Sequence, residues 1–195
     1  MKKYLGFIIG GVVLAGIVIW VVFYTINNRK STDVFSKKSS ANSEAQAIIS
    51  KDLDRFYPSS AREVVRFYQR INVCLMTKEY TEDEFYKLVD QMRALFDDEL
   101  FEKNPRGTHA EKLYYEVETF KKEGRSIPIT NLQLESQAEK YKKDGKNMAS
   151  IVALFVIKDK KGITKSYEKF VLREDENGNW KILGWELTEP VDFLE

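Results

Sequence analysis

The chain has 195 residues, of which 43 % are hydrophobic and 31 % are charged, and its formal net charge is +1. A single cysteine excludes an intrachain disulfide framework, and a single histidine excludes a histidine-rich metal centre. The length predicts one domain with additional segments, and the near-zero charge argues against nucleic acid as a partner.

The first predicted element is a membrane-spanning helix. Residues 4–26 contain no charged side chain, and as a helix they would extend about 34 Å, against roughly 30 Å for the hydrocarbon core of a bilayer. Because Lys2 and Lys3 precede this run, a cleaved signal peptide is the alternative. The apolar run is longer than that of most signal peptides, which favours a retained single-pass anchor. The small-xxx-small spacing of Gly6 and Gly10 is also compatible with a homodimer.

Basic residues on both sides of this segment leave its orientation open. Residues 1–3 form a basic tail, and residues 27–43, rich in Ser, Asn and Lys, predict a flexible linker. We expect the soluble domain outside the cytoplasm, as for an uncleaved signal anchor, with a cytoplasm-facing domain as the alternative. Residues 31–195 carry a net charge of −3, which disfavours phosphate backbones and anionic lipid as partners. The domain itself is expected over residues 44–190, with a short tail at 191–195.

Four amphipathic helices are predicted after the linker, each from an apolar stripe with a period near 3.6 residues. Residue types typical of N-caps mark their starts, and Pro, Asn or Gly marks most of their ends. The pattern Thr81-x-x-Glu84 is a capping box, which opens the third helix and its stripe of four turns. The predicted helices begin after Ser43, Ser59 or Ser60, Thr81 and Thr108, and they end before Pro58, near Leu75, at Asn104 and at Gly124.

Beyond Gly124 the apolar period changes to about two, which predicts strands. The strand over residues 150–158 is apolar on both faces and is therefore expected in the middle of the sheet. Asn177-Gly178 is a strong signal for a hairpin turn. Helices grouped before strands indicate an α+β fold, in which the helices pack on a curved antiparallel sheet. The strands are expected over residues 126–134, 150–158, 163–173 and 180–188.

The end of the chain, DENGNWKILGWELTEP (residues 175–190), resembles the last hairpin of nuclear-transport-factor-2-like (NTF2-like) domains. In that family a G-x-W-[KR]-[IV] strand closes a curved sheet over the helices. Residues 60–85 are similar to the first helix pair of the family. The resemblance implies a cone-shaped fold over roughly residues 60–190 and a role in binding or assembly, as in membrane-anchored members of the bacterial envelope. The matching residues are Gly178, Trp180, Lys181, Ile182 and Trp185.

The side chains that could perform catalysis form no recognisable constellation in the sequence. His109, at a predicted helix start, is expected to be exposed or to act as a cap. Cys74 lies beside an apolar stripe and is expected to be a buried structural thiol. Asp97, Asp98 and Glu99 are adjacent on a predicted helix, which favours a solvated face over a metal site. We therefore predict a non-enzymatic protein with no metal and no cofactor.

Aromatic residues give the better functional lead, with 12 Phe, 10 Tyr and 3 Trp. They are predicted either to line a concave face of the sheet, forming a cavity for an apolar ligand, or simply to pack the core. The main functional prediction is a single-pass membrane protein that presents an extracytoplasmic domain for protein binding or envelope assembly. The alternatives are an apolar-ligand-binding or isomerase-like cavity domain and a cytoplasm-facing adaptor. The candidate cavity residues are Tyr68, Tyr114, Tyr167, Trp180 and Trp185.

Overall fold

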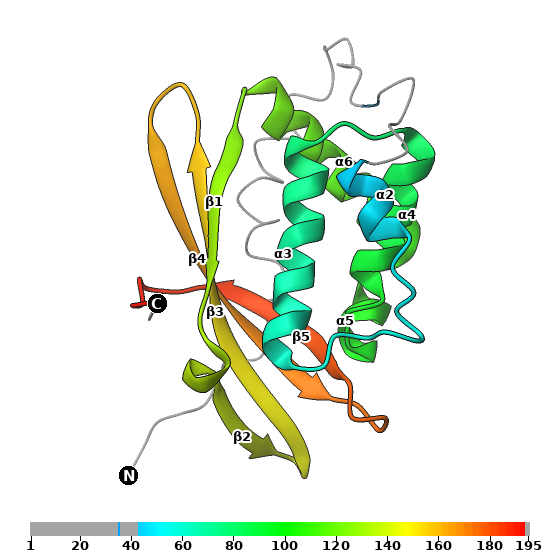
Figure 1. Cartoon of the computed structure of the whole chain (residues 1–195), viewed down its shortest axis with the longest axis vertical. Helices are drawn as coiled ribbons and strands as arrows, with labels where there is room; N and C mark the ends of the chain where they lie inside the picture. Colours follow the sequence, from blue (N-terminus) through cyan, green and yellow to red (C-terminus); the bar gives the residue numbers. More distant parts are fainter. Residues whose placement is uncertain (1–34, 36–42, 194–195) are drawn as a thin grey trace.

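The computed structural model describes residue 35 and residues 43–193 (Figure 1). In this part of the chain the helices come first and the strands follow, as the sequence pattern predicts. The strands form one antiparallel five-stranded sheet. The helices are α2 (Glu44–Ile49), α3 (Ala61–Thr77), α4 (Glu82–Arg93), α5 (Asp98–Lys103) and α6 (Arg106–Lys122), and a 3-10 turn, η2, spans Glu135–Gln137. The strands are β1 (Ser126–Leu132), β2 (Glu139–Lys143), β3 (Lys146–Lys158), β4 (Ile163–Glu174) and β5 (Trp180–Leu187).

The sheet has an interrupted strand at one edge. Its order is β1-β3-β4-β5, and β2 pairs with β3 as well. β1 pairs with residues 153–158 of β3 and β2 with residues 146–150, so the two short strands follow one another along the same edge. At the break, the backbone N–H of Gln133 donates to the carbonyl of Val152 at 3.1 Å, and the Gln133 side-chain oxygen accepts from the Val152 N–H at 2.8 Å. A side-chain amide thus takes the place of a backbone partner.

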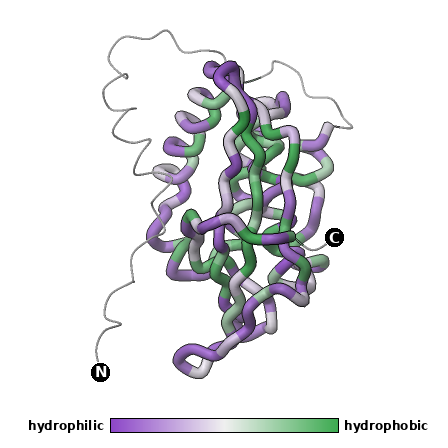
Figure 2. Tube along the Cα trace, turned by 90° about the vertical axis from the view of Figure 1, so that its left-hand side faces the viewer, coloured by the Kyte–Doolittle hydropathy of each residue, from purple (hydrophilic) through white to green (hydrophobic). Residues whose placement is uncertain are grey.

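All the described helices lie on one side of the sheet (Figure 1). The central strand β3 alternates its apolar side chains between the two faces, and Ile151, Ala153 and Phe155 face the helices and are buried in the core. Figure 2 shows apolar residues along the middle of the sheet and hydrophilic residues at the turns. On the other face, the chain after β5 returns across the sheet, where Phe193 stacks on Tyr167 with ring centroids 6.2 Å apart. The central position predicted for the strand over residues 150–158 is confirmed.

The predicted fold class needs one correction. The described residues are α+β with a curved antiparallel sheet, as expected, but among them no helix is both long and apolar enough to cross a membrane. Even α3 and α6, with 17 residues each, are interrupted by charged side chains. The segment 4–26, for which a transmembrane helix was predicted, lies outside the described residues, as do residues 1–3 and most of 27–43. The orientation and location inferred from that segment stay predictions, and so does the resemblance to NTF2-like domains.

Local capping signals predict three helix starts correctly. The Ser43 side chain accepts from the N–H of Gln46 at the start of α2. The Ser60 side chain accepts from the N–H of Glu63 at the start of α3. At the start of α4 both halves of the capping box form, between the backbone and side chain of Thr81 and those of Glu84. These caps satisfy N–H groups that have no partner within the helix, so the short-range sequence is sufficient to place them.

Three predicted helix bounds are wrong. The fourth predicted helix begins at Arg106 and not after Thr108, and no side chain caps its start. The other two bounds differ because contacts outside the helix determine them. The first predicted helix ends at Ile49, because the Gln91 side-chain amide on α4 donates to the carbonyls of Ile49 and Lys51. The Asp52 carboxylate then accepts from the N–H groups of Asp54 and Arg55 in a turn. The third predicted helix is divided into α4 and α5. Between them Leu95 and Asp97 form backbone hydrogen bonds with Ile182 of β5, both 2.8 Å long.

Candidate functional site

A cavity of about 180 Å³ lies between the helices and one end of the sheet. α3 and α6 form its helical side, and β1, β3 and β4 form the floor. Its walls are mainly apolar, which is typical of small-molecule sites, and a few polar groups converge on it. The apolar side chains are Met76, Phe120, Ile127, Phe155 and Ile157, and the polar ones are Asn72, Glu116, Thr119, Arg125, Ser166 and Glu168.

Glu168 is the buried acid of this cavity. It lies on β4 between Ser166 and Phe170, and the alternation of the strand points all three side chains toward the helices. The residue is only 7 % exposed, and the Ser166 hydroxyl donates to its Oε1 at 3.4 Å. Burial raises the pKa of Glu168 to about 7, and the Ser166 hydrogen bond offsets this only in part. Near neutral pH the carboxyl therefore exists in both protonation states, so it can donate or accept a hydrogen bond.

Two further ionisable groups lie near Glu168: Glu116 also lines the cavity, whereas Tyr68 belongs to the adjoining core. Glu116 projects from α6, and burial raises its pKa as well. Tyr68 projects from α3 and is 4 % exposed. Burial raises the Tyr68 pKa most, and the charges of Glu168 and Glu116 raise it further, whereas a hydrogen bond with Asn72 lowers it. Tyr68 therefore stays protonated and keeps a phenolic O–H beside the two carboxyl groups.

Shifted pKa values that gather in a cavity are typical of functional sites. Here the shifts have one dominant cause, desolvation, which disfavours charge on each of the three groups. A ligand that brings a hydrogen-bond donor or a positive charge into the cavity would compensate for that lost solvation. The geometry therefore favours recognition of a polar group within an otherwise apolar ligand.

The family of this protein is indicated by the sequence of nearly the whole chain and not by the cavity alone. A family model described as "Domain of unknown function (DUF6715)" matches residues 1–185 of the 195 residues. The chain belongs to the DUF6715 family. No curated protein matches it. The buried acid Glu168 of this DUF6715 protein lies within the matched region.

The structure brings together two of the five aromatic residues predicted to line a cavity. Tyr68 and Trp185 pack with ring centroids 5.3 Å apart, and both contact Phe170 in the core of this DUF6715 domain. Tyr114 instead packs against Phe85 between helices, at 6.2 Å. Tyr167 faces the opposite side of the sheet, and Trp180 is partly buried near the end of β5 that Tyr57 contacts. None of the five is among the residues that line the 180 Å³ cavity.

The sequence analysis missed the carboxyl groups of the cavity, although a signal for each is present. Glu168 occupies an inward position of a strand whose next inward residues, Phe170 and Leu172, are fully buried. Glu116 lies one helical turn from Leu113 and Phe120, which belong to the buried stripe of α6. An acidic residue within an apolar stripe is the pattern that identifies both.

Two other candidate residues, Cys74 and Asp97, are buried. Cys74 is buried, as predicted, and this raises the pKa of its thiol to about 12. The prediction of a solvated face for Asp97, Asp98 and Glu99 is wrong for Asp97, which is 6 % exposed and pairs with Arg173. Among residues 43–193 no group of three or more His, Cys, Asp or Glu side chains is arranged to hold a metal ion.

His109 differs from its prediction as an exposed or capping residue. It lies within α6, partly buried, with its ring 5.5 Å from that of Phe96, and its Nδ1 has no hydrogen-bond partner. Burial lowers the His109 pKa to about 4, helped by the positive charges of Arg93 and Lys112. The predicted cap is missing because α6 starts at Arg106, three residues before His109.

We expect His109 to make the fold less stable in acid. Below about pH 6.5 the unfolded chain binds a proton at His109, but the folded chain does so only near pH 4, so stability decreases as the pH falls through this interval. Allowing for the partial exposure of the ring, the loss is about 2 kcal/mol. Urea unfolding at pH 7 and pH 4.5 measures it. A His109→Phe variant should lack this part of the pH dependence, and an unchanged dependence would contradict the assignment.

Proposed function

We propose that this DUF6715 domain binds a small molecule in the cavity between α3, α6 and the sheet. The ligand is mostly apolar and carries one polar group that contacts Glu168. The observation that carries the proposal is a buried carboxyl group, with its pKa raised to about 7, beside about 180 Å³ of unfilled space. Burial of an ionisable group without an ion pair reduces stability, so its presence next to a cavity favours a binding role.

The volume limits the size of the ligand. An apolar cavity of roughly 150 Å³ is large enough to hold benzene. The cavity here is slightly larger, so a single ring with a short substituent matches it. Phe120 and Phe155 provide aromatic walls for such a ring, and a cationic substituent would also gain from their faces.

The polar group of the ligand is expected to be a hydrogen-bond donor. Among the described residues the Glu168 carboxyl accepts a hydrogen bond from the Ser166 hydroxyl alone, at the long distance of 3.4 Å, and Glu116 lies on the opposite wall. An alcohol or amine on the ring supplies the missing donor, and an ammonium group also neutralises an ionised carboxylate. Binding, rather than catalysis, is the function proposed, and the non-enzymatic character of the chain stays a prediction.

Benzylamine, benzyl alcohol and toluene test this proposal. Thermal unfolding of the full chain in nonionic detergent at pH 8 should show a midpoint increase of about 4 °C when benzylamine is present at about ten times its Kd. Toluene, which has the ring but no polar group, should give a smaller increase. Equal effects of all three compounds would contradict a role for Glu168.

Two matched variants locate the binding site. Thr119→Phe fills the cavity from α6 and should abolish the stabilisation by benzylamine. Thr108→Phe introduces the same side chain at an exposed position of the same helix and should leave the stabilisation unchanged. If both variants respond to benzylamine as the parent chain does, the compound binds outside the cavity and the proposal is wrong.

A further inference from the structure

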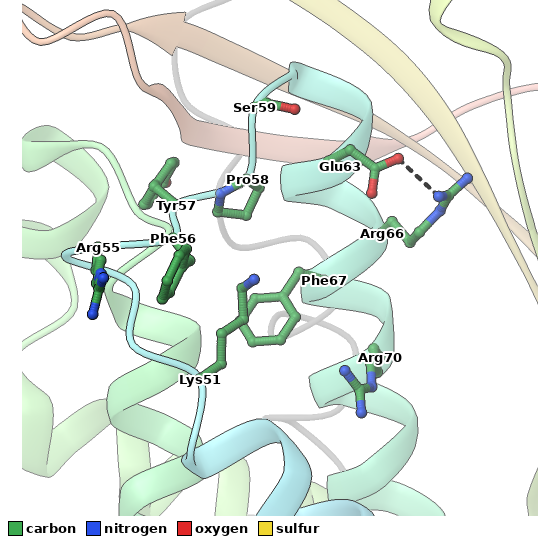
Figure 3. Close-up of a pocket in the computed structure, with 10 residues that line it drawn as sticks. All are labelled: Lys51, Arg55, Phe56, Tyr57, Pro58, Ser59, Glu63, Arg66, Phe67 and Arg70. Carbon is green, nitrogen blue, oxygen red and sulfur yellow. Dashed lines mark ion pairs between the residues drawn. The ribbon is translucent and has the colours of Figure 1, made fainter.

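A second, larger pocket opens on the surface, away from the cavity. It lies between the loop that joins α2 to α3 and the exposed face of α3, and its volume is about 580 Å³ (Figure 3). Its lining combines four basic side chains with two phenylalanines. Lys51 and Arg55 come from the loop, and Arg66 and Arg70 come from α3. Phe56 follows Arg55 on the loop, and Phe67 lies on α3, where the Lys51 side chain reaches its ring.

The pocket is positively charged, although the domain around it is not. Glu63 is the one acidic residue of the lining, and it pairs with Arg66 at 2.8 Å. Arg70 pairs with Glu44 at 2.6 Å. Within residues 43–193, Lys51 and Arg55 have no ion pair. Because residues 31–195 together carry a net charge of −3, this concentration of positive charge marks a surface suited to an anionic partner.

One phenylalanine of the pocket offers exposed apolar area, whereas the other, Phe67, is only 6 % exposed and belongs to the core. Phe56 is 58 % exposed, and the Arg55 guanidinium lies 5.1 Å from the centre of its ring. The Lys51 ammonium lies 5.6 Å from the ring of Phe67. Large exposed aromatic residues next to arginine are frequent where protein interfaces have their strongest contacts.

Hydrogen bonds fix the loop that forms one wall. The Tyr57 hydroxyl donates to the carbonyl of Trp180 on β5 at 3.0 Å. The Gln91 side-chain amide on α4 donates to the carbonyls of Ile49 and Lys51, at 3.1 and 3.0 Å. The loop is thus attached to the sheet and to a helix, and little ordering is required when a partner binds.

We propose that this pocket binds an acidic peptide segment of a partner protein, with one aromatic side chain of that segment on the exposed ring of Phe56. The loop and α3 each provide two basic side chains around this ring, which matches an extended chain that carries carboxylates before and after an apolar anchor (Figure 3). The proposal is independent of the cavity, since the two sites have no lining residue in common.

A fluorescein-labelled peptide, Glu-Asp-Glu-Phe-Asp-Glu, is the probe for this site. Fluorescence anisotropy with the full chain in nonionic detergent should show saturable binding that weakens as salt is added. The same peptide with Lys in place of each acidic residue should not bind, and replacing its Phe by Gly should weaken binding at least threefold. Absence of saturable binding by the acidic peptide would overturn the proposal. So would tighter binding to vesicles of phosphatidylglycerol than to the peptide, because it would identify a lipid surface as the partner.

Two double variants of equal charge separate the pocket from general attraction. Lys51→Glu/Arg55→Glu changes two pocket residues, and we expect it to lower the affinity at least tenfold. Lys160→Glu/Lys161→Glu changes the net charge equally at the exposed β3–β4 turn, outside the pocket, and should change the affinity less than twofold. A similar loss in both variants would show that the charge of the whole domain, and not this pocket, attracts the peptide.

A third variant tests the exposed ring of Phe56, and a fourth keeps the two proposals distinct. Phe56→Ser removes a side chain that is mostly exposed, so the fold should persist while the affinity for the peptide falls at least threefold. Thr119→Phe, which blocks the cavity, should leave peptide binding unchanged. If Thr119→Phe abolished peptide binding, the peptide would occupy the cavity and the surface proposal would be wrong.

Discussion

Replacing Glu168 by Gln is expected to stabilise the folded chain by about 3 kcal/mol at pH 8 and to leave its stability nearly unchanged at pH 4. The folded-state pKa of Glu168, about 7, lies above its ordinary value of 4.5. As the pH rises from 4.5 to 7, the unfolded chain therefore releases this proton first. The stability of the parent chain decreases through that interval, whereas a Gln side chain cannot ionise and avoids the loss.

Urea unfolding of both chains between pH 4 and pH 8 measures this difference. Glu186→Gln, which makes the same change at an exposed position of β5, is the matched control and should alter stability by less than about 0.5 kcal/mol. If Glu168→Gln is equally stable at both pH values, or destabilising at pH 8, then Glu168 is not a desolvated acid and the proposed cavity loses its central group.

Replacing Arg173 by Met is expected to lower the free energy of unfolding by about 3 kcal/mol. The guanidinium on β4 forms a two-pronged ion pair with Asp97 and contacts Glu99 at 2.8 Å. The hydrogen bond with Asp97 raises the pKa of Arg173 above its already high value. Met preserves most of the side-chain volume. The decrease in the free energy of unfolding therefore reports chiefly on Asp97, which would stay buried without its cation.

The exposed pair of Arg106 and Asp90 is the matched control for Arg173. It has the same two-pronged geometry, with contacts of 2.6 and 2.8 Å, but both side chains are about half exposed. Arg106→Met should therefore lower the free energy of unfolding far less than Arg173→Met does. A similar cost for both variants, measured by urea unfolding, would show that burial of Asp97 adds nothing to the Arg173 contact.

The parts of the fold that depend on neighbouring residues follow from the sequence. Ser60 and Thr81 cap helices through groups three residues away, and the apolar alternation of β3 identifies the central strand. Contacts between distant segments do not leave such a pattern. The division between α4 and α5 depends on hydrogen bonds between Leu95, Asp97 and Ile182. β2 was missed for a different reason, because its sequence EKYKK is fully exposed and has no apolar side to reveal it.

The candidate sites were less predictable than the fold. The aromatic residues that suggest a cavity mostly fill the core, because Tyr68 and Trp185 find partners such as Phe170 in the same layer. The carboxyl of Glu168 acquires its role only when α3 and α6 enclose a cavity with the sheet, which composition cannot show. The first predicted helix extends to Pro58 and so includes Phe56, but the early end of α2 leaves this residue on an exposed loop.

The two edges of the sheet also bear on how copies of this protein behave at high concentration. Open sheet edges can pair with one another and initiate fibrils. Here one edge is broken at Gln133, and its shorter piece carries Lys140, Lys142 and Lys143. At the other edge, residues 95–97 already occupy hydrogen-bonding groups of β5. Neither described edge offers a long uninterrupted template, so pairing of sheet edges between molecules is disfavoured.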